Sequence, residues 1–415
     1  MTTVPDRWHQ ATLAEVARWG SGGTPNTKDR SLYGGTIPWV VIGDLTDGPV
    51  HETAATITEA GLAKSSAKLI PPGAILVAMY GASIGRLGIT TREVTTNQAI
   101  AHAVPHPAVD AKFLLYYLMS QKRQLVAAGQ GAAQPNIGQG VLRKWPICFP
   151  ASIDEQRRIV ILLEDHLSRL DAAEAGLAST RRRLVALERS ALDTHFGNHP
   201  EVPLDALIEG IGAGKSFGAS NAPALDDEWG IIKVSAMTWG DFKPQENKAV
   251  PADRIDPRFE IREGDLLVSR ANTAEYVGAS VLVGPVRPKL LLSDKSLRIT
   301  AHSEVSPEWL WRALQAPAAR RQVSALATGT KDSMRNISQV ALRQILLPRA
   351  SPDEQAQAIS AFAEVKESSD RLRRTVGAQQ RRLVTIRRSL LAAAFSGLLS
   401  KDHSALSGAK EMIGA

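Results

Sequence analysis

Two segments of the chain have the hydrophobic spacing of long helices. Residues 154–190 contain a single glycine and no proline, and residues 353–395 are likewise rich in Leu, Ala, Glu and Arg. In the first segment the register of every seventh position reads Leu163, Leu170, Leu177, Leu184 and Ala191. In the second segment it reads Phe362, Ser369, Val376, Leu383 and Leu390. A stripe of this period defines one helix face that needs an apolar partner.

The other segments mix short strand-like runs with turns rich in glycine and proline. Their apolar runs predict strands, and their longer periodic stretches predict helices. The expected strands are Ile37–Ile42, Ala74–Met79, Ile231–Val234 and Asp265–Ser269, and the expected helices are Ala111–Gln121 and Pro307–Ala316. The pattern divides the chain into residues 1–150, 151–198, 199–350, 351–399 and a flexible tail, 400–415.

The second half of the chain repeats the first. Asp154–Gln156 recurs as Asp353–Gln355, Arg182–Val185 as Arg381–Val384, and Asn136–Ile137 as Asn336–Ile337. The offset is roughly 200 residues, and a repeat of this kind dictates architecture. Because the match is sharp in the helical segments and blurred elsewhere, it indicates a duplicated scaffold that carries two diverged surfaces.

Two matched long helices in one chain are expected to pair with each other. Each would span about 55 Å at 1.5 Å per residue, which is more than a mixed domain of ~150 residues would cover. A mixed domain precedes each helix, so parallel pairing would crowd both domains at one end, and we expect antiparallel pairing. The predicted pairing residues are Leu163, Leu170, Leu177 and Leu184 in the first helix and Phe362, Val376, Leu383 and Leu390 in the second.

The expected fold class is α+β, with two mixed α/β domains joined by two long antiparallel helices in a coiled coil. The duplication adds a pseudo-twofold internal repeat, and the expected shape is a dumbbell. The alternative is that each helix is an ordinary amphipathic helix packed on its own domain.

Composition favours a polyanionic partner inside the cell. The net charge is +7 and the pI is near 9.5, which favours nucleic acid. The single cysteine, Cys148, excludes an internal disulfide, fits a reducing cytoplasm and is expected to be a buried small hydrophobe. No stretch reaches the roughly 18 apolar residues of a membrane span, and the first residues lack a signal-peptide core. A cytoplasmic protein with no membrane partner is therefore expected.

No motif in the sequence supports catalysis. Gly212–Ser216 looks like the end of a phosphate-binding loop, but the required earlier glycine is replaced by Glu209. The repeat aligns Leu204–Ser216 with Leu13–Pro25, which puts Gly214 at the place of Gly23. Asn221–Pro223 is an incomplete methyltransferase-like signature, and the nine histidines and one cysteine lack metal-ligand spacing. We expect no catalytic residue, no metal site and no cofactor in this chain.

Candidate DNA-contacting residues lie mainly in two pairs of loops. Residues 79–86 and 269–273 follow equivalent predicted strands, and residues 129–136 and 328–336 precede the repeated Asn-Ile. Amides pair bidentately with adenine and arginine with guanine, whereas lysine and hydroxyl groups contact phosphates. The predicted DNA-binding residues are Thr24, Lys28, Tyr80, Gly81, Ser83, Arg86, Gln130, Gln134, Asn136, Lys215, Ser216, Arg270, Asn272, Thr273, Lys331, Ser333, Arg335 and Asn336. Each alone could be a solvated turn residue, but their recurrence at equivalent places favours recognition.

With these residues in hand, the chain resembles the specificity (S) subunit of a type I restriction-modification system. The resemblance rests on Trp8, Ser21–Pro25, Ile37–Val40 leading to Gly43–Leu45, Pro135–Ile137, Asn336–Gln339 and the paired Asp-Glu-Gln helix starts. It extends over nearly the whole chain. The sequence departs from the pattern at Gly138, where the other half has Ser338, and in lacking a second Gly-Gly-Thr-Pro run.

The resemblance implies two target recognition domains, residues 1–150 and 199–350, each reading one half of a bipartite asymmetric double-stranded DNA target. Residues 151–198 and 351–399 would be conserved spacer helices that set the separation of the half-sites and dock two modification subunits. Those methyltransferase subunits bind S-adenosylmethionine, and motor-nuclease restriction subunits use ATP and Mg²⁺.

Two alternatives stay open at the level of sequence. One is a free-standing DNA-binding or anti-restriction scaffold of the same architecture without methyltransferase partners. The other is a nucleotide-dependent enzyme that uses Gly214, Lys215 and Ser216.

Overall fold

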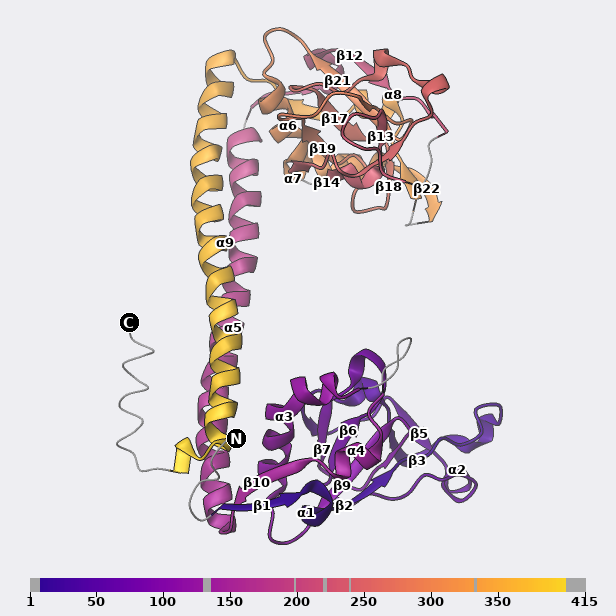
Figure 1. Ribbon diagram of the computed structural model, residues 1–415. Coiled ribbons are helices and arrows are strands. Elements are labelled where there is room, and N and C mark those ends of the chain that lie inside the picture. Colours follow the sequence, from indigo (N-terminus) through magenta and orange to yellow (C-terminus); the bar gives the residue numbers. More distant parts are fainter. Residues whose placement is uncertain are drawn as a thin grey trace. The chain divides into compact units, whose positions relative to one another are not determined.

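The chain folds into two compact units that share its two long helices (Figure 1). Unit 1 comprises Met1–Gly176 with Ala378–Ala415, and unit 2 comprises Leu177–Gly377. The computed structural model describes residues 8–129, 136–197, 199–218, 222–238, 240–331 and 334–400. The predicted DNA-binding residues Gln130, Gln134 and Ser333 lie outside the described residues, as do the side chain of Lys331 and residues 401–415 of the predicted tail.

Unit 1 is built on a five-stranded sheet in the order β2-β9-β6-β7-β4. Its strands are β2 (Ala17–Ser21), β4 (Gly48–Val50), β6 (Ile75–Ala78), β7 (Leu87–Thr90) and β9 (Ile100–Pro105). The central strand β6 is apolar throughout because it is buried on both faces. Ile75 and Val77 belong to one apolar cluster and Leu76 and Ala78 to another, as the alternation of side chains along a strand requires.

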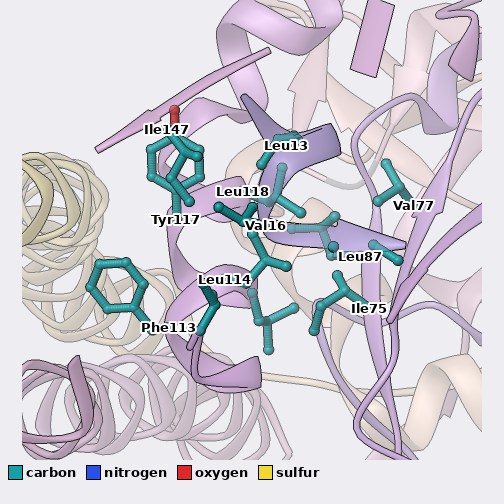
Figure 2. Close-up of a cluster of buried hydrophobic side chains, with 14 of the residues drawn as sticks. Leu13, Val16, Ile75, Val77, Leu87, Phe113, Leu114, Tyr117, Leu118 and Ile147 are labelled. Carbon is teal, nitrogen blue, oxygen red and sulfur yellow. The ribbon is translucent and has the colours of Figure 1, made fainter. Parts of the chain in front are cut away.

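Helix α3 (Ala111–Ala127) packs against this sheet through Leu114 and Leu118, whereas its Phe113 points away from the sheet and stacks edge-on with Phe395, with the ring centres 5.2 Å apart (Figure 2). The carboxylate of Asp110 caps the helix by accepting the Phe113 N–H at 3.0 Å. The helix extends beyond the predicted end at Gln121 because the fully buried Leu125 adds one more apolar contact.

The remaining elements of unit 1 surround this core. They are β1 (Trp8–Thr12), α1 (Leu13–Val16), β3 (Tyr33–Val40), β5 (Ala55–Ile57), α2 (Glu59–Ala63), β8 (Thr95–Thr96), α4 (Gln139–Arg143) and β10 (Pro146–Pro150). Strands β5, β3 and β8 form a small sheet in that order, and β1 pairs antiparallel with β10. Strand β10 leads directly into the first long helix, α5 (Ile153–Phe196).

Unit 2 is built on a four-stranded sheet in the order β12-β21-β17-β19. Its strands are β12 (Ile208–Ala213), β17 (Leu266–Ser269), β19 (Ser280–Leu282) and β21 (Ser296–Ala301), and the core also takes in α6 (Pro307–Gln315) and α7 (Pro317–Leu326). Trp309 of α6 is fully buried in that core. Smaller elements are β11 (Glu201–Pro203), β13 (Gly230–Ile232), β14 (Met237–Thr238), β15 (Asp241–Phe242), β16 (Asn247–Ala249), β18 (Ala271–Asn272), β20 (Leu290–Leu291), β22 (Thr328–Lys331), β23 (Met334–Asn336), α8 (Gln339–Arg343) and β24 (Leu346–Pro348).

The four strands of the unit 2 sheet correspond in order to the first four strands of the unit 1 sheet, and their register corrects the sequence alignment by one residue. Strand β12 pairs with β21 as β2 pairs with β9, but the pairing shifts between Ile208 and Gly210. A β-bulge that leaves Glu209 without an opposite residue explains the shift. Gly214 donates its N–H to the Ser296 carbonyl, as Gly22 does to that of Ile100. Gly214 therefore corresponds to Gly22, whereas the predicted equivalence with Gly23 was wrong.

The long helices α5 and α9 (Pro352–Phe395) have 44 residues each and run antiparallel within both units. In unit 1, Arg158 donates to the Leu399 carbonyl at 3.3 Å, and Asp171 further along α5 pairs with Arg387 earlier in α9. In unit 2, Glu188 pairs with Arg373 and the ring of Phe196 contacts that of Phe362. This confirms the predicted fold class.

The residues of the sevenfold register lie on the inward side of both helices. Leu163, Leu184, Ala191, Phe362, Ser369 and Val376 are buried, and Leu170, Leu177, Leu383 and Leu390 are half-buried. No helix in the described part of the chain is long and apolar enough to cross a membrane.

Both long helices are fastened at their starts by the glutamine of the repeated Asp-Glu-Gln sequence. The Gln156 side chain accepts the Asp110 N–H at 2.8 Å and donates to the carbonyls of Ala108 and Pro150. The Gln355 side chain accepts the Ser306 N–H at 2.7 Å and donates to the carbonyls of Glu304 and Ala350 in the same manner. Asp110 and Ser306 are the N-caps of α3 and α6, so each glutamine ties a long helix to the helix of its own domain.

Candidate nucleic-acid interface

The described ends of the two loops predicted to read DNA lie side by side in each unit. In unit 1 the Ile137 N–H donates to the Met79 carbonyl at 2.9 Å, and Tyr80 and Asn136 form an antiparallel bridge. In unit 2 the Ile337 N–H donates to the Arg270 carbonyl at 2.9 Å. A rigid sheet therefore presents two adjacent loops at the end of its central strand, which is the usual way a scaffold positions binding residues.

The unit 2 pairing is more extensive than that of unit 1. Ala271 pairs with Asn336 and Asn272 with Arg335, so β18 adds to the β22–β23 hairpin. The Arg335 guanidinium donates to the Gly329 carbonyl at 2.9 Å, across the hairpin. Gly329 has φ +141, a conformation that a side chain rarely adopts.

In unit 1 the corresponding tip is a tight turn. Gly81 and Ser83 lie in a single 3₁₀ turn, and Gly81 adopts φ +60. Tyr80 is 39% exposed immediately before this turn, and Arg86 is exposed after it. The turn therefore leaves one aromatic ring and one guanidinium available at the surface.

The predicted unit 2 residues differ in how free their side chains are. Arg270, Thr273 and Asn336 are exposed. Asn272 is engaged locally, because its amide donates to Ser269 at 3.3 Å and its oxygen accepts the Thr273 N–H at 2.8 Å. Asn272 thus shapes the turn as it stands, and Arg270 is the unit's freest charged candidate among the described residues of these loops.

The glycine-rich segments near the first strands are packed against the backbone. A Cβ on Gly22 would lie 2.2 Å from the Thr96 carbonyl oxygen, and one on Gly214 would lie 2.1 Å from that of Ser293. The Thr24 hydroxyl is bonded to Gln98. Glycine at these two positions thus permits close approach of two chain segments.

The segment 214–218 does not have the geometry of a phosphate-binding loop. Strand β12 ends at Ala213 and no helix follows in residues 214–218, whereas a phosphate loop opens a helix whose N–H groups hold the phosphate. Lys215 and Ser216 are exposed, with the Lys215 ammonium 5.8 Å from the centre of the Phe217 ring. Lys28, which follows strand β2 in unit 1, is also exposed.

A third loop flanks the two predicted ones, and the sequence did not reveal it. The Met79 N–H donates to the Ala99 carbonyl at 2.9 Å, and the Arg270 N–H donates to that of Lys295 at 2.8 Å. The third loop therefore comprises residues 97–99 in unit 1 and 293–295 in unit 2, and it exposes Gln98 and Lys295. The only available signal is a pair of polar residues between two strands, which is common in any turn.

The titratable side chains of Cys148 and His102 bear on whether this chain could carry out catalysis. Burial raises the pKa of the half-buried Cys148 thiol, which is the opposite of what a nucleophile requires. Burial, with help from Lys68 and Arg18, lowers the pKa of His102 to about 4, so this imidazole is neutral near pH 7. Among the described residues no group of three or more His, Cys, Asp or Glu could hold a metal ion.

The first unit matches a known family directly. The family model described as "Type I restriction modification DNA specificity domain" matches residues 5–178. The chain is therefore similar to type I specificity subunits over the residues of this domain. This confirms the resemblance that the sequence suggested.

Curated relatives of the family match mainly one part of the chain. The EcoEI specificity subunit of Escherichia coli is 32% identical over 181 residues, which are 43% of this chain and 30% of that protein. The MjaIX specificity subunit of Methanocaldococcus jannaschii is 29% identical over 39% of this chain and 38% of that protein. The chain thus matches about a third of the length of these relatives. The EcoKI specificity subunit of Escherichia coli K12 is 22% identical over 97% of this chain and 91% of its own length.

Solved structures show the same fold over the whole chain. One solved structure comes from work on the complex assembly and conformational transition of the type I R-M system. It has a TM-score of 0.73 at 17% identity and covers 95% of this chain and 98% of that chain. The HsdS subunit from Thermoanaerobacter tengcongensis has a TM-score of 0.55 at 18% identity, covering 95% and 98%. At these identities the likeness concerns the fold alone.

Proposed function

We propose that this chain is the DNA sequence-specificity subunit of a type I restriction-modification complex. Unit 1 reads one half of a bipartite, asymmetric double-stranded DNA target, and unit 2 reads the other half. The observation that carries the proposal is the backbone bond that joins the paired loops identically in both units, from Ile137 to Met79 and from Ile337 to Arg270. The backbone arrangement of the paired loops is the same in both units, but the side chains that the loops carry differ. Two different half-sites are therefore expected.

The exposed side chains suit base reading from the major groove. An arginine such as Arg270 can donate two hydrogen bonds to the O6 and N7 of guanine. An asparagine such as Asn136 or Asn336 can both donate to and accept from adenine. Lys28, Lys215 and Ser216 suit phosphate contacts, which position the protein without reading sequence.

The subunit itself performs no chemistry in this proposal. It docks two modification (methyltransferase) subunits through its long helices, and those subunits bind S-adenosylmethionine. Motor-nuclease restriction subunits supply the steps that need ATP and Mg²⁺. The raised pKa of Cys148 and the non-helical segment after Gly214 support a chain that binds and positions.

Methylome sequencing tests the proposal. The full chain is expressed with its modification subunits in a host that lacks other adenine methyltransferases. We expect methylated adenines in one bipartite, asymmetric motif that disappears when this chain is omitted. Methylation that persists without the chain, or a palindromic motif, would contradict the proposal.

Co-purification separates the specificity subunit from a free-standing DNA-binding or anti-restriction scaffold. A specificity subunit is expected to retain two copies of the methyltransferase through gel filtration. A chain that binds DNA specifically but retains no methyltransferase would identify the scaffold instead.

A further inference from the structure

One cluster of ion pairs joins the described parts of α5 and α9 in each unit, and the polarity is the same in both clusters. In unit 1 the Arg387 guanidinium lies 2.5 Å from Asp171 and 3.3 Å from Glu174. In unit 2 the Arg373 guanidinium lies 2.6 Å from Glu188, with Lys366 3.9 Å from the same carboxylate. The acidic partner is on α5 and the basic partner is on α9 in both units.

The repeat makes these two pairs equivalent to each other. The register that matches Arg182–Val185 with Arg381–Val384 places Glu188 at the position of Arg387. The same register places Glu174 at the position of Arg373. One ion pair is therefore the other with the two helices exchanged, and the sign of the charge follows the helix rather than the position.

Self-pairing of either helix would bring like charges together. If a second copy of α5 took the place of α9 in this register, Glu174 would face Glu188 twice. If a second copy of α9 took the place of α5, Arg373 would face Arg387 twice. Opposed like charges destabilise a helix pair, and charges beside an apolar seam are known to set partner choice.

The apolar stripe makes little of this distinction, because its only polar member is Ser369 of α9, at the place of Leu170. Leu184 and its counterpart Leu383 are both leucine, and Leu177 corresponds to Val376. Each helix would thus offer an adequate apolar face to a copy of itself. Discrimination must come from the flanking charges, and the Glu188 and Arg373 side chains are only 18% and 33% exposed, so water screens them weakly.

We propose that Glu174 and Glu188 on α5, with Arg373 and Arg387 on α9, form a charge code by which each long helix accepts the other and rejects a second copy of itself. The code acts between copies of this chain and prevents symmetric pairing of two identical halves. Taken with the proposed function, on which this consequence rests, the code keeps two different recognition units in one subunit. The target then stays asymmetric.

Two double variants of the full chain separate the code from a general effect of charge. Glu188→Arg with Arg373→Glu reverses the ion pair of unit 2, so α5 stays complementary to α9 while each helix also becomes complementary to its own copy. Glu188→Arg with Arg387→Glu makes the same two kinds of substitution and leaves the net charge the same. It opposes like charges between α5 and α9 in both units, so each helix is complementary only to its own copy.

The readouts are oligomeric state by sedimentation velocity over a range of concentrations and the midpoint of thermal unfolding. We expect the wild type and E188R/R373E to be monomeric with similar midpoints. We expect the dimer dissociation constant of E188R/R387E to be at least tenfold lower than that of E188R/R373E. We expect this difference in dissociation constant to shrink in 1 M NaCl. Equal association and equal midpoints for the two double variants would overturn the charge code.

A third variant covers the case in which E188R/R387E does not fold. Reversing all four charges, with E174R, E188R, R373E and R387E together, restores complementarity between α5 and α9, and we expect a folded monomer. If both this chain and E188R/R387E fail to fold, the code is wrong. Because no DNA enters these measurements, their outcome is independent of whether the proposed function holds.

Discussion

At the scale of single residues, backbone crowding explains the glycines that the sequence made conspicuous. Gly22 and Gly214 sit where a Cβ would lie about 2 Å from a carbonyl oxygen of the neighbouring segment. A glycine-lysine-serine run therefore arises here without a nucleotide. The one-residue bulge at Glu209 had no signature in the sequence, because a bulge is defined by its partner strand.

Adding a methyl group distinguishes the crowded Gly214, just after strand β12, from the open Gly212 within that strand. We expect Gly214→Ala to lower the free energy of unfolding by about 1–3 kcal/mol, because backbone must move to admit the Cβ. Gly212→Ala is the matched control, since its Cβ would lie 4.0 Å from the Arg298 carbonyl oxygen. Urea unfolding measures both, and equal stability of the two variants would refute the crowding argument.

Arg270 offers the sharpest test of base reading. It is exposed, and its main chain is held on both sides by Lys295 and Ile337. We expect Arg270→Ala to weaken binding by about 1–3 kcal/mol and to relax the choice of base in one half-site only. Arg262→Ala, an exposed arginine outside the paired loops, is the control. Equal losses on cognate and random DNA would identify a phosphate contact instead.

At the scale of elements, the sequence predicted what depends on local pattern. The runs at 74–79 and 265–269 formed β6 and β17, and residues 353–395 formed α9 almost to its ends. Apolar periodicity suffices for such elements because burial drives them. The side-by-side loops needed the sheet as well, and Gln98 and Lys295 were missed because no pattern marks a third loop that folds back.

The glutamine near the start of each long helix ties that helix to its own domain. Gln355 satisfies one N–H and two carbonyls, and it is 3% exposed. We expect Gln355→Ala to lower the free energy of unfolding by about 2–4 kcal/mol, because three backbone groups lose their partner. Gln357→Ala removes an exposed glutamine from the same helix and should change stability by less than ~0.5 kcal/mol. Thermal unfolding would contradict the role if the two variants matched.

At the scale of the whole molecule, the net positive charge and the duplicated pairs of loops suit two parts of the same proposed role in DNA binding. A net charge of +7 favours contact with any DNA, whereas the differing loop side chains would select a sequence. The sequence indicated both properties, since charge and repeats are visible without a structure. It did not indicate which side chains are already engaged, such as the amide of Asn272.

The salt dependence of DNA affinity directly measures how much phosphate contacts contribute to binding. Each phosphate contact removed should reduce the slope of log affinity against log salt by about one. We expect Lys215→Gln to reduce the slope on specific and random DNA alike. Arg388→Gln, an exposed charge on α9, is expected to leave the slope unchanged. Fluorescence anisotropy between about 50 and 200 mM salt gives both slopes, and an unaltered Lys215→Gln slope would exclude a phosphate contact there.

The bonds that join the paired loops run from main chain to main chain, between Ile137 and Met79 and between Ile337 and Arg270. Such bonds are indifferent to the side chains around them. The exposed side chains can therefore be substituted without breaking the backbone hydrogen bonds that hold the loops together. Chains that differ only in these exposed side chains are therefore expected to keep the same loop backbone and to recognise different half-sites.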